Sequence, residues 1–233
     1  MDILLMIIHY VGIISFTVAG AMVAIDHETD CVGVVVLGVL TCFGGGLLRD
    51  VTAGQVIGRE IPALFTHLKV ELLVSVLVGI SVFFFALIFK RQYVKEEGFV
   101  NSINNVLDAL GIGVFTAAGT GDYLAAGALV AITMGVLSSV GGSIIRDIML
   151  REVPFVLKKR IYMLALLCGA VVYYISATVL MKDAAPDLNR VVSTLLCTGV
   201  VFTVRMCATA FKWNMPKAID FAALRQSDSE NDK

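Results

Sequence analysis

The chain has 233 residues, of which 58% are hydrophobic and 16% are charged, and its formal net charge is −1. This apolar content exceeds what a soluble domain of this size needs, and it predicts membrane-spanning helices of about 20 residues each. The nearly neutral charge, with no basic stripe interleaved with aromatic residues, argues against nucleic acid as a partner.

Seven apolar segments follow one another along the chain and predict an all-α membrane protein with seven transmembrane helices. Their expected ranges are 3–25, 31–48, 68–89, 106–119, 123–149, 161–181 and 191–211. The fourth segment is short and rich in small residues, and the longest charged connection, 90–105, precedes it. We expect one transmembrane domain over 1–211 and a polar, disordered cytoplasmic tail over 212–233.

The basic residues near the ends of these segments predict the orientation in the membrane. Twelve Lys and Arg residues fall on one side and five on the other, with Arg205 inside the seventh segment. Because positive residues gather on the cytoplasmic side, we expect the N-terminus outside and the C-terminus inside. The start, Met1-Asp2-Ile3, lacks the positive region of a signal peptide, so the first span is expected to be retained.

A phrase of glycines followed by Arg-Asp occurs twice, at 44–50 and 141–147, 97 positions apart. The upstream pattern Phe-x-x-Ala-Gly at 16–20 also returns, at 115–119. Each half therefore holds three spans, and an odd number makes the two halves enter the membrane from opposite faces. The sequence predicts an inverted 3+3 repeat, with one copy at about 3–89, the other at about 105–181, and an extra helix at about 191–211.

The glycine phrases predict weakened helices, because each glycine costs about 1 kcal/mol in a helix interior. We expect the second and fifth helices to break or loosen there, with freed carbonyls and nearby hydroxyls lining an ion path. The expected lining residues are Gly44, Gly45, Gly46, Gly141, Gly142, Ser143, Thr41, Thr133, Ser138 and Ser139. The alternative is that the glycines only let the helices pack closely.

Charged residues near these phrases are candidate groups at the mouths of such a path. Arg49-Asp50 and Arg146-Asp147 are expected at opposite mouths, paired within or across the repeats. Asp108 corresponds to His9, 99 positions earlier, and either residue lines an aqueous vestibule or lies at the interface. Arg205 is expected to snorkel to the cytoplasmic interface rather than to pair inside the bundle.

Enzyme chemistry finds no support in the sequence. No GxSxG, HExxH or phosphate-binding GK[ST] motif is present. The five cysteines and three histidines show no ligand spacing, so neither a metal nor another cofactor is expected.

The doubled Gly-Gly-(Gly/Ser)-x-x-Arg-Asp phrase in a seven-span inverted repeat resembles the TRIC family, the trimeric intracellular cation channels and their prokaryotic relatives. The resemblance covers about 3–211. It implies a homotrimer with one pore per subunit, kinked second and fifth helices, and conduction of monovalent cations, mainly K⁺ and to a lesser extent Na⁺. It also implies the lipid environment of a prokaryotic cytoplasmic membrane.

The sequence departs from the pattern of this family in four places. Ser143 replaces the usual third glycine, and His9 stands where prokaryotic relatives often have an acid. The segment 51–58 lengthens the first hairpin, and no lysine motif for phosphoinositide is found, so lipid gating is not carried over. Two other functions remain open, namely a secondary transporter for a small solute such as glycine and a scaffold whose glycines only pack.

Overall fold

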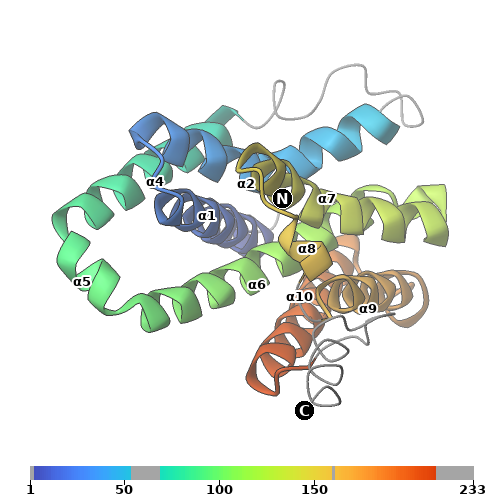
Figure 1. The fold of residues 1–233 in the computed structure, drawn as a ribbon. Helices are drawn as coiled ribbons and strands as arrows, with labels where there is room; N and C mark the ends of the chain where they lie inside the picture. Colours follow the sequence, from blue (N-terminus) through green and yellow to red (C-terminus); the bar gives the residue numbers. More distant parts are fainter. Residues whose placement is uncertain (1–2, 54–68, 159–160, 214–233) are drawn as a thin grey trace, which may run out of the picture.

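The computed structural model describes residues 3–53, 69–158 and 161–213, and almost all of them are helical (Figure 1). The long helices are α1 (Ile3–Asp26), α2 (Cys31–Ala53), α4 (Lys69–Ile88), α6 (Glu97–Asp122), α7 (Ala128–Met149), α9 (Tyr162–Ile175) and α10 (Pro186–Ala210). The short elements are α5 (Lys90–Lys95), η1 (Leu124–Ala126), α8 (Phe155–Lys158) and η2 (Ser176–Leu180), a π-helical turn that continues α9. Most of the expected tail and of the 51–58 segment lies outside the described residues.

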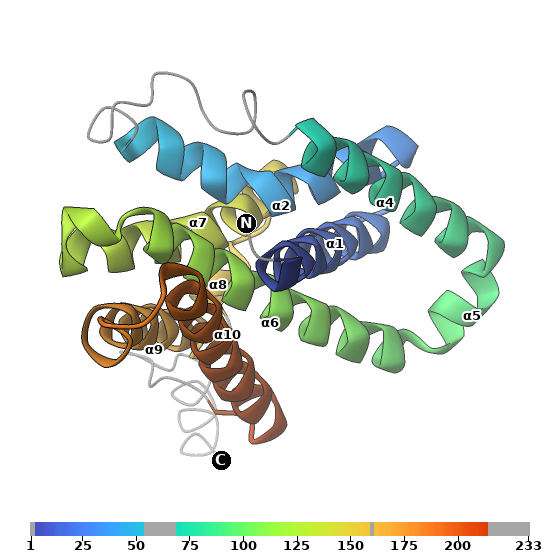
Figure 2. The ribbon, with the colours of Figure 1, turned by 180° about the vertical axis from the view of Figure 1, so that it is seen from behind.

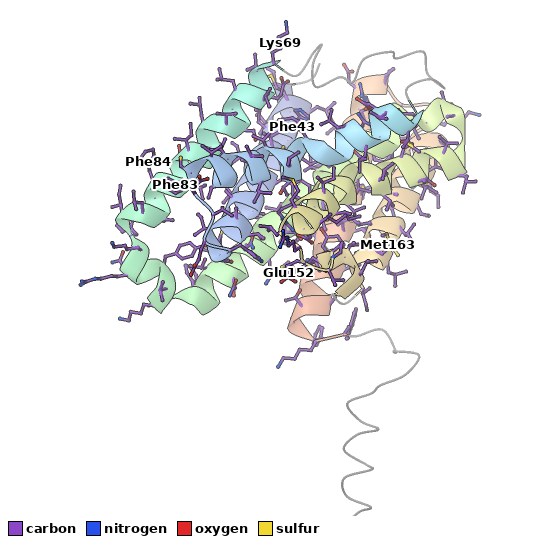
Figure 3. All side chains as sticks on the ribbon, turned by 45° about the horizontal axis from the view of Figure 1, so that its top comes forward. Phe43, Lys69, Phe83, Phe84, Glu152 and Met163 are labelled. Carbon is purple, nitrogen blue, oxygen red and sulfur yellow. The ribbon has the colours of Figure 1, made fainter. Side chains whose placement is uncertain are left out.

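The helices carry the apolar surface of a membrane protein. Six of those in the described ranges are long and apolar enough to cross a membrane, namely α1, α2, α4, α7, α9 with η2, and α10. Large apolar side chains also cover the outside of the bundle, as Phe84 does on α4 with 51% exposure (Figure 3). The all-α membrane fold is therefore confirmed. The seventh span stays a prediction, because α6 does not meet the same criteria and begins with the polar stretch 97–105.

The charged connection between the two halves, 90–105, is helical. It forms α5 and the first turns of α6. Lys, Arg, Gln and Glu are good helix formers, which lets a helix continue beyond the apolar zone. The Tyr93 hydroxyl donates a hydrogen bond to Asp26 Oδ1 at 3.2 Å and so ties α5 to the end of α1. Burial and the negative charge of Asp26 raise the pKa of Tyr93.

Both glycine phrases lie within uninterrupted α-helix. α2 continues past the expected end at 48 to Ala53, and α7 runs unbroken to Met149. The expectation of helix breaks with freed carbonyls is therefore wrong. The helical hydrogen bonds persist because each phrase is supported by the neighbouring helix, as the packing below shows. A bend of the two helix axes stays a prediction.

The helices form two groups of three that meet along a shared interface. α1, α2 and α4 pack against one another, and so do α6, α7 and α9. The two groups join where α2 packs on α7 and α1 packs on α6, and α10 lies against α6 and α9. Figures 1 and 2 show α2 and α7 lying side by side, with α4 and α10 on opposite sides of the molecule.

The glycines of α2 and α7 bring the two backbones into direct contact. A methyl group on Gly45 would overlap the carbonyl oxygen of Ser138, and one on Gly142 would overlap that of Thr41. A methyl group on Gly141 would lie 2.8 Å from the Cα of Gly45. Since the contact partners ascend along α2 as they descend along α7, the helices run antiparallel. Close packing, the alternative interpretation of the glycines, is what the structure shows here.

The same contacts obey a two-fold pseudo-symmetry. A methyl group on Gly44 would meet Ile145, and one on Gly141 would meet Leu48. Adding 97 to Gly44 and to Leu48 gives Gly141 and Ile145, so the two contacts exchange under the repeat offset. Such an exchange is the signature of an isologous interface, and it supports the inverted arrangement of the two halves.

The contact of α1 with α2 is repeated in the contact of α6 with α7. A methyl group on Gly20 would overlap Thr41, and one on Gly119 would lie 2.6 Å from Cβ of Ser138. Both pairs hold the same places in the two halves, at offsets of 99 and 97. The inward faces of the two groups are thus built alike.

We predict that Gly45→Ala and Gly142→Ala each destabilise the protein by about 1–3 kcal/mol, because the added methyl group meets rigid backbone. Gly46→Ala is the matched control, since nothing lies within 4 Å of its added Cβ and alanine favours the helix. Thermal unfolding in detergent checks this. Equal melting temperatures for all three variants would contradict the packing described here.

Candidate functional site

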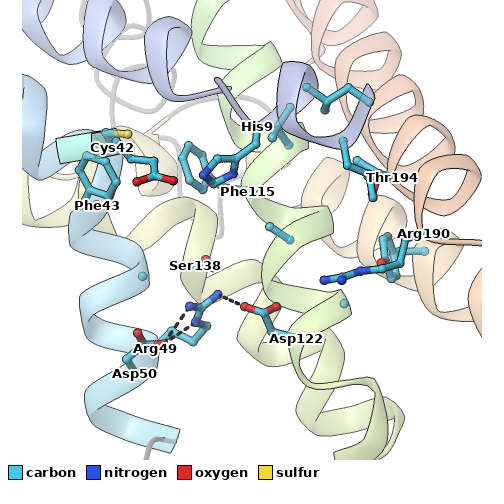
Figure 4. A pocket seen from close by; sticks show the side chains of 18 of the residues that line it. His9, Cys42, Phe43, Arg49, Asp50, Phe115, Asp122, Ser138, Arg190 and Thr194 are labelled. Atoms are coloured by element: carbon cyan, nitrogen blue, oxygen red, sulfur yellow. Dashed lines mark hydrogen bonds and ion pairs between the residues drawn. The ribbon is translucent and has the colours of Figure 1, made fainter. Parts of the chain in front are cut away.

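A cavity of about 350 Å³ lies beside the crossing of α2 and α7 (Figure 4). Each of the seven long helices contributes to its wall. The apolar wall includes Cys42, Phe43, Val114 and Phe115. The polar and charged lining residues are His9, Arg49, Asp50, Glu71, Asp122, Ser138, Tyr173, Arg190 and Thr194.

Arg49 crosses one end of this cavity and links α2 to α6. Its Nε and Nη2 lie 2.9 and 2.8 Å from Asp50 Oδ1, and its Nη1 lies 3.1 Å from Asp122 Oδ2 (Figure 4). The Arg49 and Asp50 side chains are only 9% and 3% exposed. Charges buried this deeply need paired partners, so the two carboxylates stabilise the guanidinium where it stands.

The charged lining leaves the cavity with an excess of negative charge. Two arginines, Arg49 and Arg190, face three carboxylates, those of Asp50, Glu71 and Asp122. With His9 neutral, the balance is one negative charge. A concave site of this sign raises the local concentration of cations and lowers that of anions.

The second Arg-Asp phrase forms its own buried pair away from the cavity. Arg146 Nε and Nη2 donate to Asp147 Oδ1 at 2.9 and 2.8 Å, and Asp147 Oδ2 accepts the Phe155 N–H at 2.7 Å. Because α2 and α7 are antiparallel, the two phrases leave the crossing in opposite directions. Their position at opposite mouths of a path stays a prediction.

Arg205 is buried rather than extended to the interface, so the snorkelling expectation is wrong. It is 2% exposed, and its Nη2 donates to Asp108 Oδ2 at 3.2 Å. Its guanidinium carbon also lies 4.3 Å from the centre of the Tyr162 ring. A carboxylate and an aromatic face together hold the charge inside the bundle. The Asp108 side chain therefore pairs with Arg205 of α10, and it does not line the cavity described above.

The residues expected to line a path separate into three groups. Gly46, Arg49, Asp50 and Ser138 do meet at the cavity. Gly44, Gly45, Gly141 and Gly142 lie in the helix crossing instead. The remaining hydroxyls donate within their own helices, with Thr41 bonding to Leu37 O, Ser139 to Val136 O, Ser143 to Val140 O and the exposed Thr133 to Leu129 O.

Sequence reasoning missed three of the charged lining residues. Asp122, Arg190 and Glu71 all face the cavity, although none of them is among the residues expected from the sequence to line a path. Asp122 is in fact the last residue of α6, and Arg190 lies in the second turn of α10. The one available signal was a charged residue standing next to the end of an apolar segment.

A family profile described as "Glycine transporter" matches residues 6–87 and 105–178, which contain the two glycine phrases. The UPF0126 inner membrane protein YadS of Escherichia coli K12 is 33% identical over 209 residues, covering 88% of this chain and 90% of that protein. The chain belongs to the family that this profile describes. The UPF0126 membrane protein YvgT of Bacillus subtilis is 30% identical, with 88% and 92% covered.

Solved structures of TRIC channels share the fold of this family member. A prokaryotic TRIC channel crystallised in 0.5 M KCl has a TM-score of 0.74 and 26% identity, covering 92% of this chain and all of that one. The TRIC trimeric intracellular cation channel orthologue from Rhodobacter sphaeroides has a TM-score of 0.73 and 30% identity, with 91% and 100% covered. The resemblance to the TRIC family is therefore confirmed, and the structural neighbours are channels rather than enzymes.

We predict that Asp108→Leu destabilises this TRIC-family protein by about 3–5 kcal/mol, because it leaves the Arg205 charge buried without its carboxylate. The double variant Asp108→Leu with Arg205→Met should recover most of this loss, since an apolar pair can replace a buried ion pair. Melting temperatures in detergent measure both effects. A double variant less stable than the single one would contradict the pairing.

Proposed function

We propose that the chain is a passive channel for monovalent cations, mainly K⁺, with one path through each subunit of a homotrimer. The observation that carries the proposal is the cavity with excess carboxylate beside the glycine crossing, in a fold shared with proteins described as TRIC cation channels. We place it in the cytoplasmic membrane of a prokaryote, in line with the inner-membrane relative.

The charges of the cavity favour cations without binding them tightly. Asp50 and Asp122 are engaged by Arg49, which leaves Glu71 as the lining carboxylate outside that group. A single acidic group attracts a cation but does not replace its hydration shell, as a ring of backbone carbonyls would. We therefore expect strong discrimination against anions and at best modest preference for K⁺ over Na⁺.

The second candidate is a secondary transporter for a small solute such as glycine. The cavity has the size of a small-molecule site and lies on the Arg49 side of the crossing, without contact to Arg146 or Asp147. A site on one side of a pseudo-symmetric crossing also suits alternating access. The description of the matching family profile points the same way.

Reconstitution of the purified full chain distinguishes the two functions. In a planar bilayer with KCl, a channel gives unitary current steps whose reversal potential follows the K⁺ gradient. Saturable counterflow of labelled glycine without such steps would overturn the channel in favour of the transporter. The absence of both signals would overturn both.

The proposed orientation and assembly make a separate prediction. A cysteine at Lys95 should react with a membrane-impermeant thiol reagent only from the cytoplasmic side, and one at Lys182 only from outside. Lys95 lies on the side of the membrane predicted to carry more Lys and Arg residues, and Lys182 lies on the side predicted to carry fewer. Both side chains are exposed. Reversed labelling would contradict the orientation, and crosslinking in mild detergent that stops at two subunits would contradict the trimer.

A further inference from the structure

Arg190 differs from the other arginine of the cavity in how its charge is balanced. Arg49 touches two carboxylates, those of Asp50 and Asp122. Arg190 is exposed. Within the described residues, no carboxylate oxygen lies within 4.0 Å of its guanidinium nitrogens, the distance that defines an ion pair. Figure 4 shows its side chain extending into the cavity. Its positive charge therefore acts on the cavity without a bound counter-charge.

The residue before Arg190 fixes the start of α10 against the end of α9. The Asn189 amide Nδ2 donates to the carbonyl oxygens of Ala177 and Met181, both at 2.9 Å. Its Oδ1 accepts the hydroxyl of Ser193, one turn further along α10, at 3.2 Å. Both polar atoms of the Asn189 side chain are thus bonded: Nδ2 joins α10 to the end of the preceding helix, and Oδ1 is held within α10.

The carbonyls that Asn189 binds belong to an unusual part of the fold. Ala177 lies in the π-helical turn η2, and Met181 directly follows it. A π-helical turn displaces the regular hydrogen bonds of a helix and often occurs near functional sites. Here the turn and the residue after it present two carbonyl oxygens to the Asn189 side chain of α10. These two hydrogen bonds set the direction in which the Arg190 side chain leaves the helix.

We propose that Arg190 limits cation entry and reduces cation selectivity at this mouth, and that Asn189 is its positioning residue. The proposal rests on the channel function proposed above. The wall of the cavity carries two positively charged side chains, Arg49 and Arg190, and three carboxylates. Neutralising Arg190 therefore changes its balance from one to two negative charges, which strengthens the attraction for K⁺ and the exclusion of Cl⁻.

The size of the effect follows from Coulomb interaction across water. A unit charge several ångströms from a cation changes its local concentration about two- to threefold at low salt. The Debye length falls to about 3 Å at 1 M salt, so the effect should nearly vanish there. A structural disturbance would not show this dependence on salt.

The test uses the full chain in planar bilayers at 50 mM and at 1 M KCl, with reversal potentials in a KCl gradient. Arg190→Gln should raise the conductance about two- to threefold at 50 mM, leave it nearly unchanged at 1 M, and move the reversal potential toward that of K⁺. Arg190→Lys should behave as the unmodified chain. Lys182→Gln is the charge-matched control, because Lys182 is exposed near the same end of α10 but does not line the cavity.

The role of Asn189 is tested by combining variants. Asn189→Leu removes both donors and should change conductance and its salt dependence in the same direction as Arg190→Gln. In the Arg190→Gln background it should have little further effect, since the charge it positions is gone. An equal effect in both backgrounds would show that Asn189 is only structural and would overturn its positioning role.

The outcomes separate this inference from the function on which it rests. If the unmodified chain gives no unitary current, the channel function fails and this inference falls with it. If the unmodified chain conducts and Arg190→Gln matches Lys182→Gln at both salt concentrations, the channel stands and the role of Arg190 is overturned.

Discussion

The direct contact between the backbones of α2 and α7 is the constraint on which the rest of the structure depends. No Cβ fits at Gly45 or Gly142, because the carbonyls of Ser138 and Thr41 occupy that space. Helices in a membrane gain little from the hydrophobic effect when they associate, so close van der Waals contact through small residues holds them together. The contact joins the two halves in antiparallel orientation and sends their Arg-Asp phrases to opposite sides.

The backbone symmetry of the two halves is broken by their charged side chains. Arg49 binds Asp122 as well as Asp50 and forms part of a cavity wall. Its counterpart Arg146 binds Asp147, which is itself anchored to the Phe155 N–H beyond the end of α7. One end of the crossing therefore holds a cavity of about 350 Å³ with charged groups in its wall, while Arg146 and Asp147 at the other end form an internal pair. In the proposed channel, this asymmetry assigns the entrance for a cation to the Arg49 side.

The sequence predicted the parts of this structure that depend on local pattern or on repetition. Apolar runs placed α1, α4 and α10 within a few residues, and the shared offset of 97 predicted antiparallel glycine segments. The continuity of α2 and α7 could not be foreseen, because helix propensity does not contain the support that each glycine phrase receives from the other.

The partners of the charged residues were equally beyond sequence reasoning. Arg205 and Asp108 are 97 positions apart, and the Tyr162 ring beside them is on a third helix. Nothing in the sequence near Arg205 indicates that its side chain meets the Asp108 carboxylate inside the bundle. Likewise, Arg190 lies in a polar stretch that looks like a loop, and only the packing of α10 against α9 turns it toward the cavity.

The central claim, that the space beside the glycine crossing carries the ions, is tested most directly by chemical modification of Ser138. In a background in which the native cysteines are replaced, Cys42 of the cavity included, Ser138→Cys should react with a small, positively charged thiol reagent applied outside. The current of one proposed homotrimer should then fall in three equal steps. Complete modification confirmed by mass spectrometry, with the current unchanged, would contradict it.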